Sequence, residues 1–140
     1  MQITRETDYA IRCVLYLASR TDRVIMVDEI AREMATPKSF LSKILQKLVR
    51  ADIARSFRGV KGGFQLNREP RNITLLDVIE AVEGSIAMNK CVLDTSSCGF
   101  SGTCAVHPIW VRIRGEVNEL LARHNFEDIS RSVRLDESGS

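Results

Sequence analysis

One stretch of this chain decides its fold: Thr36-Pro-Lys-Ser-Phe-Leu-Ser-Lys-Ile-Leu-Gln-Lys-Leu-Val-Arg-Ala51. Its apolar side chains follow the i, i+3, i+4, i+7 spacing of one buried helix face: Leu41, Ile44, Leu45 and Leu48. The opposite face is polar and basic: Ser39, Ser42, Lys43, Gln46, Lys47 and Arg50. Thr36 as N-cap and Pro37 as first helical residue predict the start, because proline has no N–H to leave unpaired there.

Two further helices are predicted upstream. Thr4–Ser19 combines an N-cap threonine with an apolar stripe, beside which Cys13 is expected as a core residue. After a short apolar run at 24–27, which favours an edge strand, residues 28–34 predict a short helix, and Ala35-Thr36-Pro37 then breaks the chain. A short helix, a tight turn and the amphipathic helix form a helix-turn-helix pattern. This pattern alone fits a solvated helix in any small helical domain equally well.

The segment after the amphipathic helix favours the helix-turn-helix reading. Residues 53–58 alternate apolar and polar side chains, and Phe64-Gln-Leu66 resumes the pattern after Gly59-Val-Lys-Gly-Gly63. Two short strands around a glycine-rich turn predict a hairpin, which in this position is a wing. Arg58 and Lys61 line it, and its glycines let backbone approach a phosphate or groove closely. A nucleotide phosphate loop is disfavoured because the Walker spacing is missing. The predicted fold class is mainly α with a small β-hairpin wing, a winged helix-turn-helix domain.

The second half of the chain predicts two more helices. Thr74 and Asp77 form a capping box at the start of one, and Gly84 is a natural end for it. The other begins at Pro108 and runs to about Arg123. Its apolar stripe needs a partner surface, and a second copy of the chain is the simplest candidate: Ile109, Ile113, Val117, Leu120 and Leu121. Residues 126–129 predict a last turn packed back on the domain.

These patterns divide the chain into four parts and point to its partners. We expect a DNA-binding domain at 1–84, a ligand-bearing loop at 85–107, a dimerisation helix with a C-terminal turn at 108–133, and a flexible tail at 134–140. Residues 1–71 carry a net charge of +6 and residues 72–140 one of −4, as expected for a nucleic-acid-binding module with an appended part. No segment resembles a membrane span or a secretory signal, so we expect a cytoplasmic protein that binds no membrane. Together with the predicted dimerisation helix, this indicates a cytoplasmic homodimer.

Three cysteines and a histidine gather in the predicted loop as Cys91-x6-Cys98-x5-Cys104-x2-His107. Structural zinc sites usually contain cysteines two to four residues apart, and these cysteines are farther apart. Spread thiolates on one irregular loop favour an iron–sulfur cluster. A cysteine–histidine hydrolase is disfavoured, because neighbours on one loop form no substrate cleft. The fourth ligand is open: His107, a small molecule, or a partner-chain residue such as Asp8 would complete the set.

Four stretches resemble the Rrf2 family of bacterial transcription regulators: Thr4–Arg12, Phe40–Leu48, Phe57–Leu66 and Ile73–Glu83. The resemblance covers residues 2 to about 133, and the Arg-Gly-x-x-Gly-Gly wing followed by three cysteines is a specific combination. It implies a dimer, joined through the long helices, that reads a palindromic operator in double-stranded DNA. Ser39 and Ser42 lie where the family enters the major groove, and Arg58 where it contacts DNA from the wing. Charge and helix face alone add Lys38, Lys43 and Lys61 as phosphate contacts.

The resemblance also implies the cluster type, in two versions. Cys104-Ala-Val-His107 resembles the IscR-like branch, in which cysteines and a histidine hold a 2Fe–2S cluster. Asp8 resembles the NsrR-like and RirA-like branch, in which a partner-chain aspartate completes a 4Fe–4S cluster. The first spacing, Cys91 to Cys98, is one residue longer than is common in the family. We expect a non-enzymatic regulator that senses iron, redox state or nitric oxide, with 2Fe–2S preferred and 4Fe–4S as the alternative. A clusterless member responding to a protein or small molecule is the other hypothesis.

Overall fold

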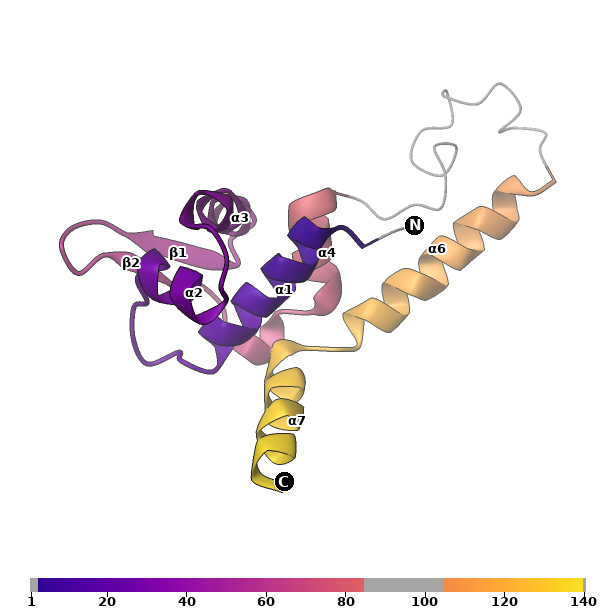
Figure 1. Ribbon diagram of the computed structural model, residues 1–140. Helices are drawn as coiled ribbons and strands as arrows, with labels where there is room; N and C mark the ends of the chain where they lie inside the picture. The colour runs from indigo at the N-terminus through magenta and orange to yellow at the C-terminus, as the bar shows by residue number, and fades with distance from the viewer. Residues whose placement is uncertain (1–2, 85–104, 140) are drawn as a thin grey trace.

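The computed structural model describes residues 3–84 and 105–139, and the side chains among them up to residue 132 (Figure 1). A helical domain with a two-stranded hairpin lies at one side, and one long helix extends away from it. The elements in chain order are α1 (Arg5–Ala18), α2 (Val27–Glu33), α3 (Lys38–Arg50), β1 (Ala54–Phe57), β2 (Gly63–Leu66), the 3-10 turn η1 (Pro70–Asn72), α4 (Leu75–Glu83), α6 (His107–Ala122) and α7 (Phe126–Gly139). The predicted fold class, mainly helical with a winged hairpin, is confirmed.

Helices α1, α3 and α4 enclose the core. All four apolar residues predicted for the inner face of α3 are fully buried. Cys13 of α1 lies among them, which confirms its expected place. Thr4 caps α1 as predicted, since its hydroxyl accepts a hydrogen bond from the backbone N–H of Thr7.

The turn between α2 and α3 differs from the prediction at one residue. Thr36 is not the N-cap of α3, because Pro37 occupies that position and Lys38 is the first helical residue. The Thr36 hydroxyl instead donates to the carbonyl of Met34 at 3.0 Å, and the side chain is buried. Its backbone N–H donates to Ala31, so threonine closes the tight turn rather than opening the next helix.

The wing is an antiparallel hairpin with Ala54 opposite Leu66 and Phe57 opposite Gly63. Two backbone hydrogen bonds of 2.8 Å join Ile25 to Phe64, so the short apolar run before α2 forms one bridge rather than a strand. A Cβ on Gly63 would lie 2.3 Å from the carbonyl oxygen of Ile25. Glycine is therefore required at this position because the hairpin is pinned against the segment that leads into α2.

Helix α4 begins with the predicted capping box of Thr74 and Asp77. The chain returns beside this start after α6: the N–H of Leu75 donates to His124, and that of Phe126 to Ile73. Phe126 is fully buried, which confirms the expected packing of this segment on the domain.

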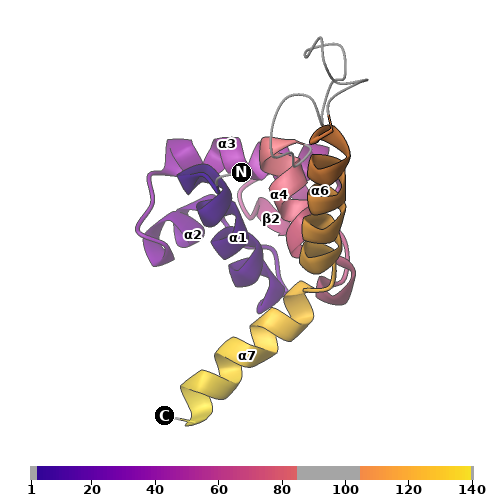
Figure 2. The same cartoon turned by 90° about the vertical axis from the view of Figure 1, so that its right-hand side faces the viewer.

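The end of α6 that leads into α7 lies near α4, and the rest of the helix extends away from the domain (Figure 1), while Figure 2 shows the same helices from the side. None of its residues is buried. Helix α7 continues to Gly139, so the expectation of a loose tail at 134–140 is wrong for 134–139. Asn125 and Asp128 cap the start of α7, and Arg131 pairs with Glu127 one turn apart. No helix among the described segments is long and apolar enough to span a membrane.

Candidate DNA interface and cysteine-bearing segment

The outer face of α3 presents the side chains that the sequence assigns to DNA. Ser39 and Lys43 are exposed, and Ser42 is half-buried with its hydroxyl donating to the carbonyl of Lys38 at 2.9 Å. Because the opposite face is fixed in the core, these side chains have a defined direction relative to the domain. The structure thus brings the α3 candidates onto one helix face.

The wing carries the other two candidates. Arg58 and Lys61 are exposed in the loop between β1 and β2, and Val60 at the tip is 96% exposed. Gly59 adopts a φ of +106°, and a Cβ on Gly62 would meet the carbonyl of Phe57 at 2.3 Å. Gly59 and Gly62 therefore determine the shape of the turn, and this turn places Arg58 and Lys61 at the end of the wing.

A groove of about 230 Å³ separates the wing from the helix-turn-helix. Its lining combines the start of α2, the first residue of α3 and the hairpin: Met26, Val27, Asp28, Lys38, Ser56, Phe57, Gly59, Gly62, Gly63 and Phe64. Lys38 Nζ lies 2.8 Å from Asp28 Oδ1 at this groove. Sequence reasoning placed Lys38 at this surface but missed its acidic partner, because no local spacing pairs two residues ten apart across a turn.

A polar cluster fixes the position of α2. The guanidinium of Arg23 donates to both carboxylate oxygens of Glu29, at 3.0 and 2.7 Å, and the Tyr16 hydroxyl donates to Glu29 at 2.6 Å. These hydrogen bonds lower the pKa of Glu29 to about 2. The guanidinium of Arg20 stacks over the Tyr16 ring at 3.8 Å. The cluster ties the end of α1 to α2 and so positions the first helix of the helix-turn-helix.

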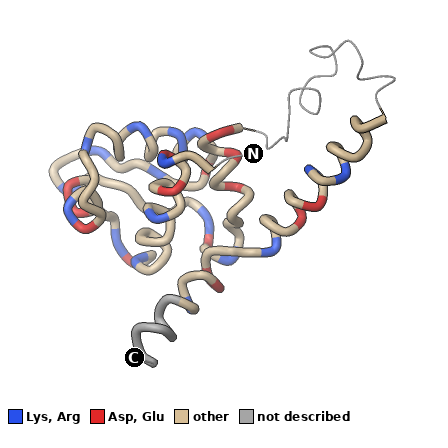
Figure 3. Tube along the Cα trace, turned by 45° about the vertical axis from the view of Figure 1, so that its right-hand side comes forward, with Lys and Arg blue, Asp and Glu red and all other residues tan. Residues whose placement is uncertain are grey.

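Basic and acidic residues are spread over the whole described chain, including α6 (Figure 3). The DNA candidates are therefore distinguished by their place on α3 and the wing rather than by an exclusively basic surface. Lys47 of α3 pairs with Glu6 of α1 at 2.7 Å, so the charge of this lysine is already neutralised within the domain.

The three cysteines of the proposed ligand set, Cys91, Cys98 and Cys104, lie outside the described residues. His107 is the first residue of α6, half-buried, and the preceding cap position holds the apolar Val106 without a side-chain cap. Within the described ranges, no group of three His, Cys, Asp or Glu side chains is placed to hold a metal ion.

Asp8, the alternative fourth ligand, is exposed on α1 and pairs with Arg12 at 3.1 Å. It lies one residue after Thr7, whose hydroxyl donates to Glu83 at 2.7 Å. The end of α4, where the cysteine-bearing segment begins, thus contacts the first turn of α1. No local sequence pattern indicates this contact, which joins residues 76 positions apart.

Cys13 lies on α1, far in sequence from the three cysteines of the proposed ligand set. It is fully buried, and burial raises the pKa of its thiol to about 12. A thiol held protonated in the core is a poor metal ligand, since metals bind the thiolate. Cys13 therefore belongs to the hydrophobic core.

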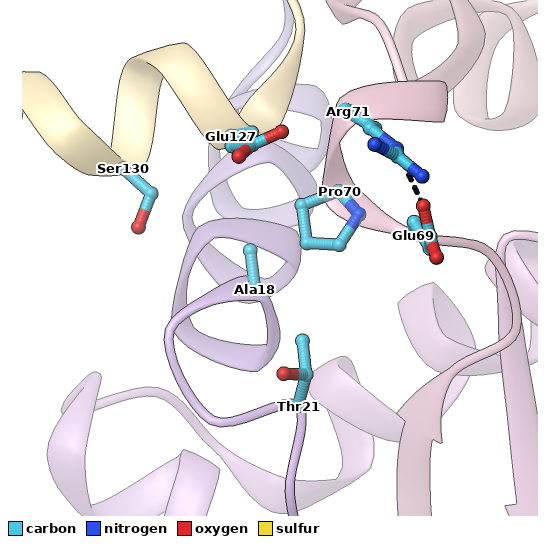
Figure 4. Close-up of a pocket in the computed structure, with 7 residues that line it drawn as sticks. All are labelled: Ala18, Thr21, Glu69, Pro70, Arg71, Glu127 and Ser130. Carbon is cyan, nitrogen blue, oxygen red and sulfur yellow. Dashed lines mark ion pairs between the residues drawn. The ribbon is translucent and has the colours of Figure 1, made fainter.

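A second hollow of about 380 Å³ lies where α1 ends against η1 and α7 (Figure 4). Its lining is Ala18, Thr21, Glu69, Pro70, Arg71, Glu127 and Ser130, with an ion pair between Arg71 and Glu69. None of the residues singled out for DNA or a cluster lines it.

A short helix, a tight turn, an amphipathic second helix and a glycine-shaped hairpin define the winged helix-turn-helix class of DNA-binding proteins. A family model described as "Iron-dependent Transcriptional regulator", Rrf2, matches residues 3–132. The chain belongs to the Rrf2 family. It is accordingly a DNA-binding transcription regulator and not an enzyme.

Individual relatives agree with this assignment. The protein aau3 of Rhizobium meliloti is 32% identical over 133 residues, covering 94% of this chain and 86% of aau3. The transcriptional regulator NsrR of Shouchella clausii is 27% identical, covering 89% of this chain and 80% of NsrR. Among solved structures, CymR, the global cysteine regulator of B. subtilis, aligns with a TM-score of 0.75 and 26% identity over 94% of this chain and 98% of CymR.

Proposed function

We propose that this protein is a cytoplasmic homodimeric regulator whose affinity for a palindromic operator depends on an iron–sulfur cluster. The observation that carries the sensing part is the donor set Cys91, Cys98, Cys104 and His107, which spans seventeen residues after α4 and ends at the first residue of α6. Cysteine thiolates hold iron–sulfur clusters, and in some centres imidazoles replace part of them. The residues present therefore fit such a group, and Cys13, which is fully buried in the core, is not one of the proposed ligands.

DNA binding is assigned to α3 and the wing. Ser39 and Ser42 would reach base edges in the major groove, and Arg58 would contact DNA from the wing. Lys38, Lys43 and Lys61 would contact phosphates. Support comes from the exposure of these side chains on one face of α3 and on the β1–β2 loop.

The homodimer is supported by α6. Ile109 and Leu120 are 55% and 54% exposed on a helix with no buried residue. A helix of this kind needs a surface to cover its apolar side chains, and a second copy supplies an identical one. Two copies related by a two-fold axis would present two recognition helices, which is why we infer a palindromic operator.

A bound cluster would make the protein a sensor, because oxidation, nitric oxide or iron shortage would alter the cluster or remove iron from it. Cys91, Cys98 and Cys104 would hold it, with His107 or the partner chain's copy of Asp8 as the fourth ligand. His107 connects the ligand set directly to α6, so a change at the ligands would act on the proposed dimer helix. This connection favours His107 and a 2Fe–2S cluster over Asp8 and a 4Fe–4S cluster.

Anaerobic purification tests the sensing part. We expect a coloured protein with bound iron and acid-labile sulfide, and neither in a C91A/C98A/C104A variant, while Cys13→Ala keeps both. Equal iron and sulfide in wild type and triple variant, or none in wild type after reconstitution, would overturn the cluster and favour the clusterless hypothesis. Mössbauer spectra of His107→Ala and Asp8→Ala identify the fourth ligand, since only its loss alters the iron environment.

A further inference from the structure

Lys38 differs from the other basic residues of the proposed DNA surface, because it is already paired. Its Nζ lies 2.8 Å from Asp28 Oδ1, and both side chains are 59% exposed. Among the residues that the structure describes, Lys43, Arg58 and Lys61 take part in no ion pair. The surface therefore contains three unpaired cations and one neutralised cation.

The pair sits between the wing and both helices of the helix-turn-helix. Asp28 lies in the first turn of α2, Lys38 is the first residue of α3, and both line the groove beside Ser56 and Phe57 of the wing. Helix N-termini carry partial positive charge, which favours Asp28 and disfavours Lys38. The carboxylate thus stabilises Lys38 at a helix end where a lone cation would be unfavourable.

DNA would act on the two residues in opposite ways. A phosphate attracts the ammonium of Lys38 and repels the carboxylate of Asp28, which lies within hydrogen-bonding distance of that ammonium. Lys38 can therefore contact a phosphate only if its ammonium leaves Asp28, or if the Asp28 carboxylate also comes close to the DNA. Either route cancels most of the gain that an unpaired lysine would give.

We propose that Asp28 limits DNA affinity by neutralising Lys38 and so withholds one cation from the phosphate backbone. This inference rests on the proposed DNA-binding role of α3 and the wing. It changes the assignment of Lys38 from a simple phosphate contact to one half of an affinity-limiting pair.

The test measures binding to an unrelated duplex at several salt concentrations. Asp28→Asn keeps the shape of the side chain and removes its charge, so one more counterion should be released on binding. The slope of log affinity against log salt should steepen by about 0.9, and the gain over wild type should shrink roughly three- to four-fold between 50 and 200 mM salt. Lys38→Met should weaken binding, and the double variant D28N/K38M should return to the wild-type slope.

Glu69→Gln is the matched control, because it removes the same charge from another exposed ion pair, with Arg71, on η1. A D28N effect no larger than that of E69Q would overturn the proposal. So would a D28N/K38M variant that binds as tightly and with the same steeper slope as D28N, because the gain would then not come from Lys38. Thermal unfolding of each variant establishes that it is folded.

The same titrations separate this inference from the proposed function. Wild type should prefer DNA from upstream of its own gene over the unrelated duplex, and equal affinity for both would contradict the proposed operator binding. A wild type that discriminates, together with a D28N variant equal to E69Q, would overturn only the role of Asp28.

Discussion

Glu83, the last residue of α4, accepts a hydrogen bond of 2.7 Å from the buried hydroxyl of Thr7 in α1. The same carboxylate oxygen accepts the backbone N–H of Thr4 at 3.0 Å. Burial opposes ionisation of Glu83, but the hydrogen bonds from Thr7 and Thr4 outweigh it, so the pKa of Glu83 is lowered. The first turn of α1 and the end of α4 are thereby joined by a charged hydrogen-bond network.

Removing the hydroxyl of Thr7 should destabilise this junction. Thr7→Val keeps the volume but leaves the Glu83 carboxylate without its shortest donor, which we expect to cost about 1–3 kcal/mol of unfolding free energy. Urea denaturation at fixed protein concentration measures it. Ser19→Ala is the control, since that hydroxyl donates to Tyr16 at an exposed site and its loss should change stability by less than about 0.5 kcal/mol. A T7V variant as stable as wild type would contradict the structural role of the contact.

Glu29 should make stability depend on pH in the acid range. Its pKa is about 2 in the folded protein against an ordinary 4.5, because Arg23 and Tyr16 donate to the ionised form. A lowered folded pKa means that the stabilisation is complete above 4.5 and is lost as the pH falls from 4.5 towards 2. The stability difference between wild type and Glu29→Gln should therefore shrink over that window. Denaturant titrations at several pH values measure it, and a difference that does not change with pH would contradict this account.

The glycines of the wing should tolerate alanine unequally. Gly63→Ala would place a Cβ against the backbone of Ile25, so either the hairpin or the segment before α2 must shift. We expect a loss of about 1–3 kcal/mol, by the cost of overpacking, and weaker DNA binding. Gly59→Ala has open space around its Cβ and meets only the strain of its positive φ, so its loss should be smaller. Thermal unfolding compares the two, and equal tolerance would show that the hairpin is not pinned at Ile25.

Charges on the exposed apolar side chains of α6 should separate the proposed dimer. Ile109→Glu combined with Leu120→Glu would bury carboxylates in the interface, so we expect a monomer that keeps its helical content. Sedimentation velocity measures the mass. Val60→Glu makes the same kind of change at the wing tip, where the side chain is even more exposed, and should leave the mass unchanged. A double variant with the mass of wild type would place the dimer contact elsewhere.

Local sequence patterns predicted the elements whose determinants lie within a few residues. The capping box of Thr74 and Asp77 set the start of α4, and the spacing of Leu41, Ile44, Leu45 and Leu48 set the buried face of α3. The glycine-rich turn set the hairpin and hence the wing.

The sequence-based predictions were wrong where the same residues are compatible with two different local structures. Thr36 before Pro37 fits an N-cap, yet its hydroxyl closes the preceding turn instead. The polar run at 134–139 fits a loose tail by composition, yet it is part of helix α7. Contacts between distant residues, such as Thr7 with Glu83, leave no local pattern because folding alone brings them together.

The candidate site was predictable to different extents. Positions on α3 follow from helical periodicity, so the exposure of Ser39 and Lys43 could be foreseen. The Asp28–Lys38 pair depends on how the turn orients two helices, which periodicity does not encode. The roles of Cys91, Cys98, Cys104 and His107 still rest on their residue types and spacing.

One measurement tests the central claim most directly: fluorescence-anisotropy titration of DNA from upstream of the gene with one preparation, before and after its cluster is removed anaerobically. The account predicts that wild-type affinity changes by roughly 5- to 150-fold, the usual range for coupling between two sites. The C91A/C98A/C104A variant should bind with one affinity under both conditions. A wild-type affinity that is the same with and without the cluster would contradict the claim that operator binding depends on it.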